Sequence, residues 1–407
     1  MSEASPPPRV LPSDQNASGR SFGEEERKAL AEVLAAGTLI STKGSVVKEF
    51  ESEFAAWLGV RHAVACSSGT AAVHTALAAL DLEPGDEVIT TPITDMGALT
   101  PILYQGLIPV FADVDPSTGL LDPASVEDRI GPRTRAVIAT HLFGHPGSAE
   151  PLARVAADRG LALIEDCAQA YGASTRGRKV GTFGALACFS LQQGKHITCG
   201  EGGLVVTGDD RLARRCRLFV NKAWPYGEPD PDHEFLAPNY RMTELQGAVA
   251  LAQLRKLDRL LDARTETAEA FCRSARNLRG VAAPVLGPED RHAYWRIPLT
   301  VSGDATRRSL KEVARDLQRA GIAASAGYTG RPAFACRLFR EQATFGRSRY
   351  PFTLARPEAV DYRPERFPGT MEFIRRVLVI GWNERMDHED TRYVLERLEE
   401  ALGQGGR

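Results

Sequence analysis

Apolar segments and amphipathic helical patterns alternate along the chain up to about residue 207. The helical patterns, in which apolar residues recur every three or four positions, lie at 24–36, 46–58, 69–80 and 148–159. Apolar runs of five to seven residues, which are typical of buried strands, lie at 62–66, 87–91, 108–114, 135–140, 161–165, 185–191 and 203–207. This alternation predicts an α/β fold, in which a mostly parallel sheet is covered on both faces by helices.

The pattern changes in the second part of the chain. From Met242 to about Asn277 the apolar residues keep helical spacing, so one long helix is expected there. A strand, a helix, a second strand and a final helix are then expected at 294–301, 307–320, 377–380 and 388–402. We therefore predict three parts: a flexible N-terminal arm at 1–21, a large α/β domain at 22–260 and a small α+β domain at 261–407.

Composition and charge exclude several classes of protein. The chain has 50 basic and 52 acidic residues, a net charge of −2, so nothing indicates a surface for nucleic acid or an anionic membrane. No apolar run approaches the roughly 20 residues of a membrane-spanning helix, and the N-terminus lacks the apolar core of a signal peptide. Seven dispersed cysteines without metal-ligand spacing are typical of free thiols in a reducing compartment. A cytoplasmic protein without a bound metal is expected.

One polar loop contains the strongest candidate for chemistry. Only eight of the 50 basic residues are lysines, and Lys195 lies between a predicted strand and the glycines at 200, 202 and 203. Glycine permits close approach of the backbone, and a lysine amine with a lowered pKa can form a Schiff base. The alternative is an ordinary surface lysine in a turn, and the loop by itself leaves both interpretations open.

Two further segments follow predicted strands, where ligands of parallel sheets usually bind. Asp166 is expected either to pair with a cation, such as a protonated pyridine nitrogen, or to cap the next turn. Ser68, Gly69 and Thr70 begin a predicted helix, whose free N–H groups suit a phosphate, although a hydroxyl there is also an ordinary N-cap. An imine-forming lysine, a carboxylate for a pyridinium and a phosphate seat are together what pyridoxal 5′-phosphate requires.

Several segments match a known family in order and spacing. They are 44–64, 68–72 (SGTAA), 84–89 (PGDEVI), 109–115 (PVFADVD), 165–169 (EDCAQ), the lysine loop that ends in GEGG at 203, and 239–242 (NYRM). The series resembles the DegT/StrS-type sugar aminotransferases, strongly over about 22–260 and more diffusely beyond. The resemblance implies a fold-type I pyridoxal-phosphate transferase.

The resemblance implies roles for the matching residues. Lys195 would form the Schiff base with the cofactor and move protons, Asp166 would pair with the pyridinium, and Gln169 would bind the ring 3′-oxygen. The phosphate would be held by Ser68, Gly69, Thr70 and Ser190. Asn239 would reach the phosphate bound by a neighbouring subunit, which implies a homodimer with shared active sites.

Substrate contacts and one departure from the family complete the predicted site. Arg241 would lie near the shared site and meet a substrate carboxylate, and Lys222 would border it. Family members usually carry an aromatic residue on the cofactor ring where an ungapped alignment places Asp95. Met96 is adjacent and is expected to supply soft packing on the ring.

The resemblance also implies an activity. An amino group would pass from L-glutamine or L-glutamate to a keto-sugar or keto-cyclitol, in amino-sugar or antibiotic biosynthesis. Because of Asp95, elimination, decarboxylation or other carbanion chemistry on an amino acid remains an alternative. A binding protein without turnover is a third possibility, against which the presence of Lys195 argues. An acceptor pocket or an ordinary interface is expected around His292, Tyr294, Trp295, Arg296, Tyr328 and Arg331.

Overall fold

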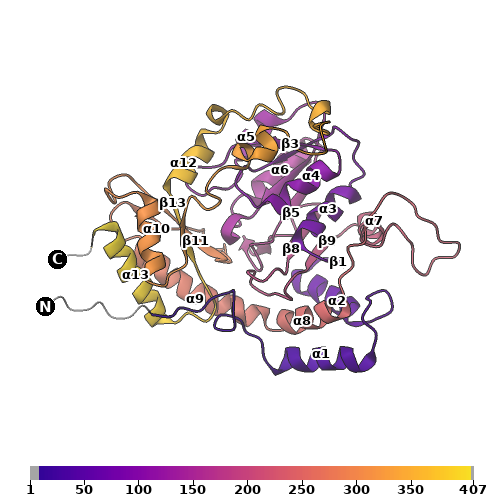
Figure 1. Ribbon diagram of the computed structural model, residues 1–407, viewed down its shortest axis with the longest axis horizontal. Coiled ribbons are helices and arrows are strands. Elements are labelled where there is room, and N and C mark those ends of the chain that lie inside the picture. The colour runs from indigo at the N-terminus through magenta and orange to yellow at the C-terminus, as the bar shows by residue number, and fades with distance from the viewer. Residues whose placement is uncertain (1–8, 405–407) are drawn as a thin grey trace.

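The computed structural model describes residues 9–404, and its largest unit is built on a seven-stranded sheet (Figure 1). The strands are β1 (His62–Cys66), β2 (Glu87–Thr90), β3 (Ile108–Phe111), β4 (Thr134–Thr140), β5 (Ala162–Asp166), β8 (Leu186–Ser190) and β9 (Gly203–Thr207), in the order β1-β9-β8-β5-β4-β2-β3. From β8 to β3 all neighbours are parallel, whereas β9 is antiparallel to β1 and β8. The predicted mostly parallel sheet is confirmed.

Helices cover both faces of this sheet because successive side chains of each strand point to opposite sides. In β1, Ala63 and Ala65 pack against α2 and α8, while Val64 and Cys66 pack against α3 and α7. The helices of this unit are α1 (Glu24–Ala36), α2 (Val46–Leu58), α3 (Gly69–Ala79), α4 (Thr100–Tyr104), α5 (Pro123–Arg129), α6 (Ala149–Asp158), α7 (Asp210–Val220) and α8 (Glu244–Leu254). A short hairpin of β6 (Ser174–Thr175) and β7 (Arg178–Lys179) completes it.

A second, four-stranded antiparallel sheet forms the core of the C-terminal part. Its strands are β10 (Val281–Ala282), β11 (Arg296–Val301), β13 (Val377–Gly381) and β12 (Ala324–Ala326), in that order. The helices α10 (Leu310–Arg319), α11 (Arg337–Arg340), α12 (Pro368–Arg376) and α13 (His388–Leu402) follow along the chain. Within residues 9–404, no helix is both long and apolar enough to cross a membrane.

The two units are joined by α9 (Leu257–Ala275), so the predicted boundary at residue 260 falls inside a helix. Its first turns pack into the large core through Leu257 and Leu261, and its last turns pack into the small core through Phe271. The sequence predicted one long helix from Met242 to about Asn277, but the structure has two helices there, α8 and α9. At the break, the Lys256 amine donates to the carbonyl oxygen of Ser21 at 3.0 Å.

Part of the predicted C-terminal domain packs on the large unit. Phe334, Phe339 and Phe367 form one hydrophobic cluster with Leu103 and Phe111, which belong to α4 and β3. Figure 1 shows this orange and yellow segment above β3 and α4. The two parts of the chain are therefore interleaved rather than separated at one boundary.

The N-terminal segment also differs from the expected flexible arm. Residues 1–8 lie outside the described part of the chain. Between 9 and 21 the chain is hydrogen-bonded to both units, and the Arg20 side chain is buried. A compositional pattern of polar and proline residues predicts a loose arm, but it does not detect such long-range contacts.

Candidate active site

A cavity of about 410 Å³ lies where β5 and β8 end and α3 begins. It lies at the carboxyl ends of parallel strands, as expected for ligands of such sheets. Most of the predicted cofactor residues line it, namely Ser68, Gly69, Thr70, Asp95, Asp166, Gln169, Ser190 and Lys195. Segments separated by more than a hundred residues in the chain thus meet in one cavity.

Lys195 and Asp166 form the charged centre of this cavity. Burial lowers the pKa of the Lys195 amine, and the nearby Asp166 carboxylate opposes that shift. Burial raises the pKa of Asp166, while the Ala168 N–H, which donates to its Oδ1 at 3.1 Å, opposes the change. Asp166 therefore caps the turn after β5 and also lines the cavity, so the cap does not exclude the predicted pairing with a cation.

The start of α3 presents polar groups of the kind that bind a phosphate. Ser68 is the N-cap, since its Oγ accepts from Ala71 N–H at 3.0 Å, and the N–H groups of Gly69 and Thr70 in the first turn have no partner within the helix. A Cβ at position 69 would lie 2.7 Å from Ser190 Cβ and 2.9 Å from Ser190 Oγ. Only glycine fits at position 69 without a shift of Ser190. The first N–H groups of the helix and the Ser190 hydroxyl therefore lie close together, an arrangement that can bind an anion.

Gln169 is fixed by two hydrogen bonds at the edge of the cavity. Its Oε1 accepts from Phe143 N–H at 2.7 Å, and its Nε2 donates to the Tyr328 hydroxyl at 3.1 Å. Burial raises the pKa of Tyr328 to about 12, so this hydroxyl keeps its proton near neutral pH and can donate a hydrogen bond.

The sequence pattern did not single out several residues that line the cavity. Trp295 and Tyr328 were candidates among six residues of the C-terminal part, and the structure places these two in the lining, together with Thr94, Gln192 and Glu201. The Lys195 amine lies 4.4 Å from the centroid of the Trp295 ring. Local sequence does not separate Trp295 and Tyr328 from the other four candidates, because the C-terminal part brings them to the cavity from far along the chain.

Asp95 and Met96 are adjacent at the start of the short 3₁₀ turn η1 (Met96–Ala98), but their side chains have different surroundings. Asp95 lines the cavity, and its Oδ1 accepts from Gly97 N–H at 2.8 Å. Met96 instead packs against the hydrophobic cluster that contains Leu99 and Phe334. The structure therefore places Met96 in a hydrophobic cluster, which differs from its predicted packing on the cofactor ring.

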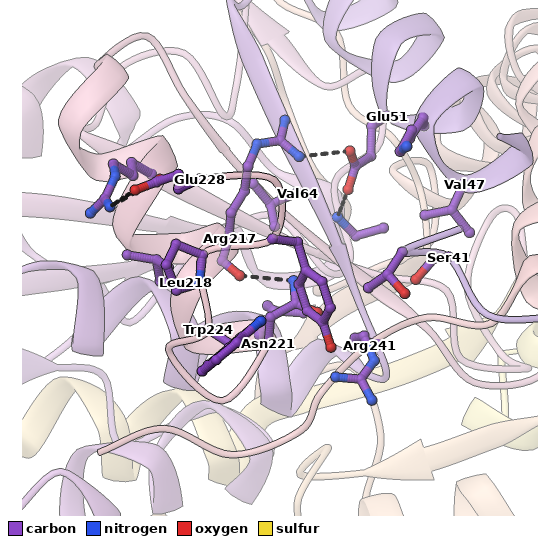
Figure 2. Close-up of a pocket in the computed structure, with 17 residues that line it drawn as sticks. Ser41, Val47, Glu51, Val64, Arg217, Leu218, Asn221, Trp224, Glu228 and Arg241 are labelled. Carbon is purple, nitrogen blue, oxygen red and sulfur yellow. Dashed lines mark hydrogen bonds and ion pairs between the residues drawn. The ribbon is translucent and has the colours of Figure 1, made fainter. Parts of the chain in front are cut away.

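Asn239, Arg241 and Lys222 lie outside the lining of the Lys195 cavity of their own chain. Asn239 is exposed, and its Oδ1 accepts from Arg241 N–H at 3.3 Å. Arg241 lines a second cavity of about 320 Å³, which lies between α2, α7 and the loop after α7 (Figure 2). Lys222 N–H in the same loop donates to the Pro238 carbonyl oxygen at 2.9 Å.

A buried group next to Asp166 has the composition of a metal site. The ligand atoms of His141, Glu165 and Cys167 lie within 4.8 Å of one another. The Glu165 carboxylate, however, accepts three backbone N–H groups at 181–184 at 2.7 to 2.8 Å and lies 2.9 Å from His141 Nε2. These contacts use its oxygen lone pairs and fix the end of β5, which carries Asp166.

The sequence has relatives along most of its length. The pattern of the DegT/DnrJ/EryC1/StrS aminotransferase family matches residues 20–399. GDP-perosamine synthase of Caulobacter vibrioides is 39% identical over 290 residues, which is 70% of this chain and 76% of that protein. The spore coat polysaccharide biosynthesis protein SpsC of Bacillus subtilis is 31% identical over 393 residues, which is 94% of this chain and 95% of that protein.

Solved structures share the fold over nearly the whole chain. 3-Amino-5-hydroxybenzoic acid (AHBA) synthase matches with a TM-score of 0.86 and 27% identity, covering 98% of this chain and 100% of that one. DesV of S. venezuelae matches with a TM-score of 0.80 and 31% identity, covering 93% and 94% of the two chains. These matches confirm the predicted fold of a fold-type I pyridoxal-phosphate transferase. The chain belongs to the DegT/DnrJ/EryC1/StrS aminotransferase family, and it is an aminotransferase.

Proposed function

We propose that the cavity around Lys195 binds pyridoxal 5′-phosphate and that the enzyme transfers an amino group from L-glutamine or L-glutamate to a keto-sugar or keto-cyclitol. One observation carries this proposal: a lysine amine, a buried carboxylate and a helix start with a hydroxyl line the same cavity. Relatives named for amino-sugar synthesis support the acceptor class, as GDP-perosamine synthase and a dTDP-amino-sugar transaminase do.

The residues fit the three parts of the cofactor. The phosphate would be held by the first N–H groups of α3 and by Ser190 Oγ, where the absence of a Cβ at Gly69 leaves the space. Asp166 would pair with the ring nitrogen, and Lys195 would bind the aldehyde carbon. The bound cofactor supplies an electron sink for the charge that remains when the donor loses its Cα proton.

The side chains of this chain would then move and hold protons. The Lys195 amine, whose pKa is lowered by burial, has a larger neutral fraction near pH 7 and can accept the Cα proton at Nζ and return it. Asp166 stays a carboxylate when a cation lies against it, and it would keep that cation protonated. The Tyr328 hydroxyl, which lines the cavity, would donate a hydrogen bond to a bound group, and the Trp295 ring lies 4.4 Å from the amine.

The acceptor can be identified by a transfer assay with purified enzyme and cofactor. Each donor would be incubated with keto-cyclitols, free keto-sugars and nucleotide-linked keto-sugars, and the amine product measured by mass spectrometry. We expect one acceptor class to gain an amino group in equal amount to the 2-oxo acid formed. If 2-oxo acid forms but none of the acceptors gains an amino group, transfer to a ketone is contradicted.

Asp95 favours one alternative reaction on the same cofactor. It places a carboxylate in the cavity lining where the family usually has an aromatic residue. Elimination or decarboxylation of an amino acid would release ammonia or carbon dioxide without any acceptor. The same assay without ketone distinguishes the two, because a transaminase stops after one amino group per active site whereas a lyase continues.

We also propose that two subunits complete each other's sites. Asn239 is exposed outside its own cavity, and its main chain pairs with Asn221 in an antiparallel bridge. An exposed asparagine held on such a loop is placed to reach a neighbouring molecule, as the family resemblance implies for the cofactor phosphate. Arg241 and Lys222 would then border the neighbour's substrate.

Mixing two inactive variants tests this sharing. Lys195→Ala and Asn239→Ala subunits, unfolded together and reassembled, would form mixed dimers with one intact site. With cofactor at a concentration that saturates intact sites but not sites without Asn239, random assortment predicts about a quarter of wild-type activity, well above either variant alone. Activity equal to the mean of the two separate variants would contradict shared sites.

A further inference from the structure

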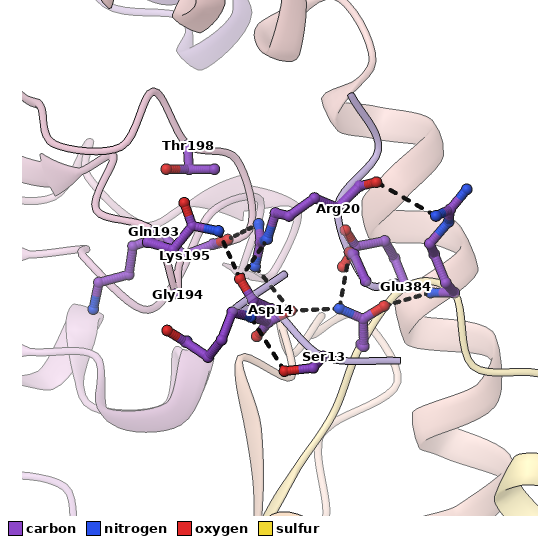
Figure 3. Close-up of polar contacts among 12 residues, drawn as sticks. Ser13, Asp14, Arg20, Gln193, Gly194, Lys195, Thr198 and Glu384 are labelled. Carbon is purple, nitrogen blue, oxygen red and sulfur yellow. Dashed lines mark hydrogen bonds and ion pairs between the residues drawn. The ribbon is translucent and has the colours of Figure 1, made fainter. Parts of the chain in front are cut away.

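The N-terminal segment at residues 13–20 contacts the main chain of the lysine on which the proposed function depends. Arg20 Nη1 donates to the carbonyl oxygen of Lys195 at 2.8 Å. In the same loop, Gln193 Nε2 donates to the main-chain carbonyl oxygen of Asp14 at 2.8 Å. Figure 3 shows both contacts, with the Lys195 amine pointing away from Arg20. We call residues 13–20 the N-terminal clasp.

The Arg20 guanidinium is buried, and each of its three nitrogens lies close to an oxygen atom of Asp14 or Lys195. Only 3% of the residue is exposed. Its Nε donates to the carbonyl oxygen of Asp14 at 2.9 Å, and its Nη2 lies 2.8 Å from Asp14 Oδ1. A buried guanidinium is costly unless it is paired and hydrogen-bonded, so Asp14 supplies the counter-charge that allows Arg20 to lie beneath the lysine loop.

The clasp is anchored to the C-terminal part of the chain. Asn383 Nδ2 donates to Asp14 Oδ1 and to the carbonyl oxygen of Gly19, the latter at 3.1 Å. Arg264 Nη2, on α9, lies 3.7 Å from Asp14 Oδ1. A Cβ at position 19 would lie 2.5 Å from the carbonyl carbon of Ser13 and 2.7 Å from Asn383 Nδ2, so only glycine permits this close packing.

The other residues of the lysine loop are also held from outside. Trp295 Nε1 donates to the carbonyl oxygen of Gly194 at 2.6 Å, and His196 Nε2 lies 2.9 Å from the carbonyl oxygen of Ala293. The lysine peptide is therefore held between the small sheet and the clasp. Without Arg20, the carbonyl of Lys195 would lose the long-range partner that sets its orientation.

We propose that Arg20 and Asp14 are positioning residues, which fix the main chain of Lys195 so that its amine occupies one place in the cavity. The proposal rests on the proposed function. The clasp acts through main-chain contacts, and neither side chain touches the reacting atoms. Because Asn383 and Arg264 bind the same aspartate, the placement of the lysine also depends on the docking of the small sheet.

Replacement of Arg20 by methionine tests the proposal. We expect Arg20→Met to bind pyridoxal phosphate, to keep the donor KM within about threefold, and to lower kcat about 10- to 100-fold, since a small misplacement of a reacting group has effects of this size. Uptake of the cofactor by the apo protein, followed by its visible absorption, should slow in parallel. Asp14→Asn keeps the main-chain carbonyl that Arg20 and Gln193 bind, so we expect a smaller loss of the same kind.

The matched control is Arg129→Met. Arg129 is another partly buried arginine whose Nε donates to a backbone carbonyl, that of Phe111 at 2.9 Å, at the end of the edge strand β3. Its replacement should change stability without changing kcat or cofactor uptake.

If Arg20→Met fails to fold, Asp14→Asn provides the kinetic comparison. Wild-type kcat and uptake in a folded Arg20 or Asp14 variant would overturn the positioning role alone, whereas a wild-type protein without cofactor absorption would overturn the proposed function with it.

Discussion

Replacement of Lys195 by alanine should lower kcat by about 10⁴-fold. The amine is proposed both to bind the cofactor covalently and to carry the Cα proton, and each of these contributions is large. Because α-amino groups of donors can still react with the cofactor in solution, residual activity should rise slowly with added cofactor. The measurement is the steady-state rate of 2-oxo acid formation at saturating donor and acceptor.

Lys179→Ala is the matched control for this variant. The Lys179 amine lies 4.2 Å from the centroid of the Trp57 ring and donates to the Trp57 carbonyl oxygen, so it is also a partly buried lysine beside an indole. It lies on β7, away from the cavity. We expect its kcat to stay within a factor of about two of wild type. A Lys195→Ala enzyme as active as Lys179→Ala would exclude every catalytic role assigned to Lys195.

Replacement of Asp166 by asparagine should have the second largest effect, a fall in kcat of about 10²- to 10³-fold. Such losses are typical when one fixed electrostatic partner of a transition-state charge is removed. The amide has nearly the same shape, and its oxygen can still accept the Ala168 N–H that caps the turn. What is lost is the negative charge that we propose lies beside the ring nitrogen, so cofactor affinity should also weaken.

Replacement of a second capping aspartate, outside the cavity, serves as a control for Asp166→Asn. It shows whether loss of an aspartate cap by itself changes the kinetics. Asp209 caps α7, where its Oδ1 accepts from Leu212 N–H at 2.9 Å, outside the cavity. Asp209→Asn should leave kcat and the cofactor dissociation constant unchanged. Equal kinetics for Asp166→Asn and wild type, with the fold intact by circular dichroism, would show that Asp166 is only a cap.

The chemistry of the site could be predicted where it depends on local sequence. The strand before Asp166, the helix start at Gly69 and the glycine-rich loop around Lys195 each have a pattern that is visible within about ten residues. Parallel strands align their carboxyl ends, so the meeting of these three segments follows from the predicted sheet. The structure agrees with this placement, since all three line one cavity.

Long-range contacts could not be predicted in the same way. Trp295 and Tyr328 reach the cavity only because the small sheet docks against the lysine loop, and no spacing rule connects them to Lys195. Arg20 lies in a polar, proline-rich stretch whose composition is typical of a loose arm, yet its burial depends on Asp14 and Asn383. The composition of a segment predicts only its local conformation. The positions of these residues depend on contacts with residues far along the chain, which local sequence does not predict.

The most direct measurement is the visible absorption spectrum of the wild-type protein with pyridoxal phosphate, before and after addition of L-glutamate or L-glutamine. We expect a visible band from the cofactor bound to Lys195, absent in Lys195→Ala, which disappears when one of the two donors is added and returns with the matching 2-oxo acid. A wild-type protein that develops no such band in excess cofactor would contradict the assignment of the Lys195 cavity.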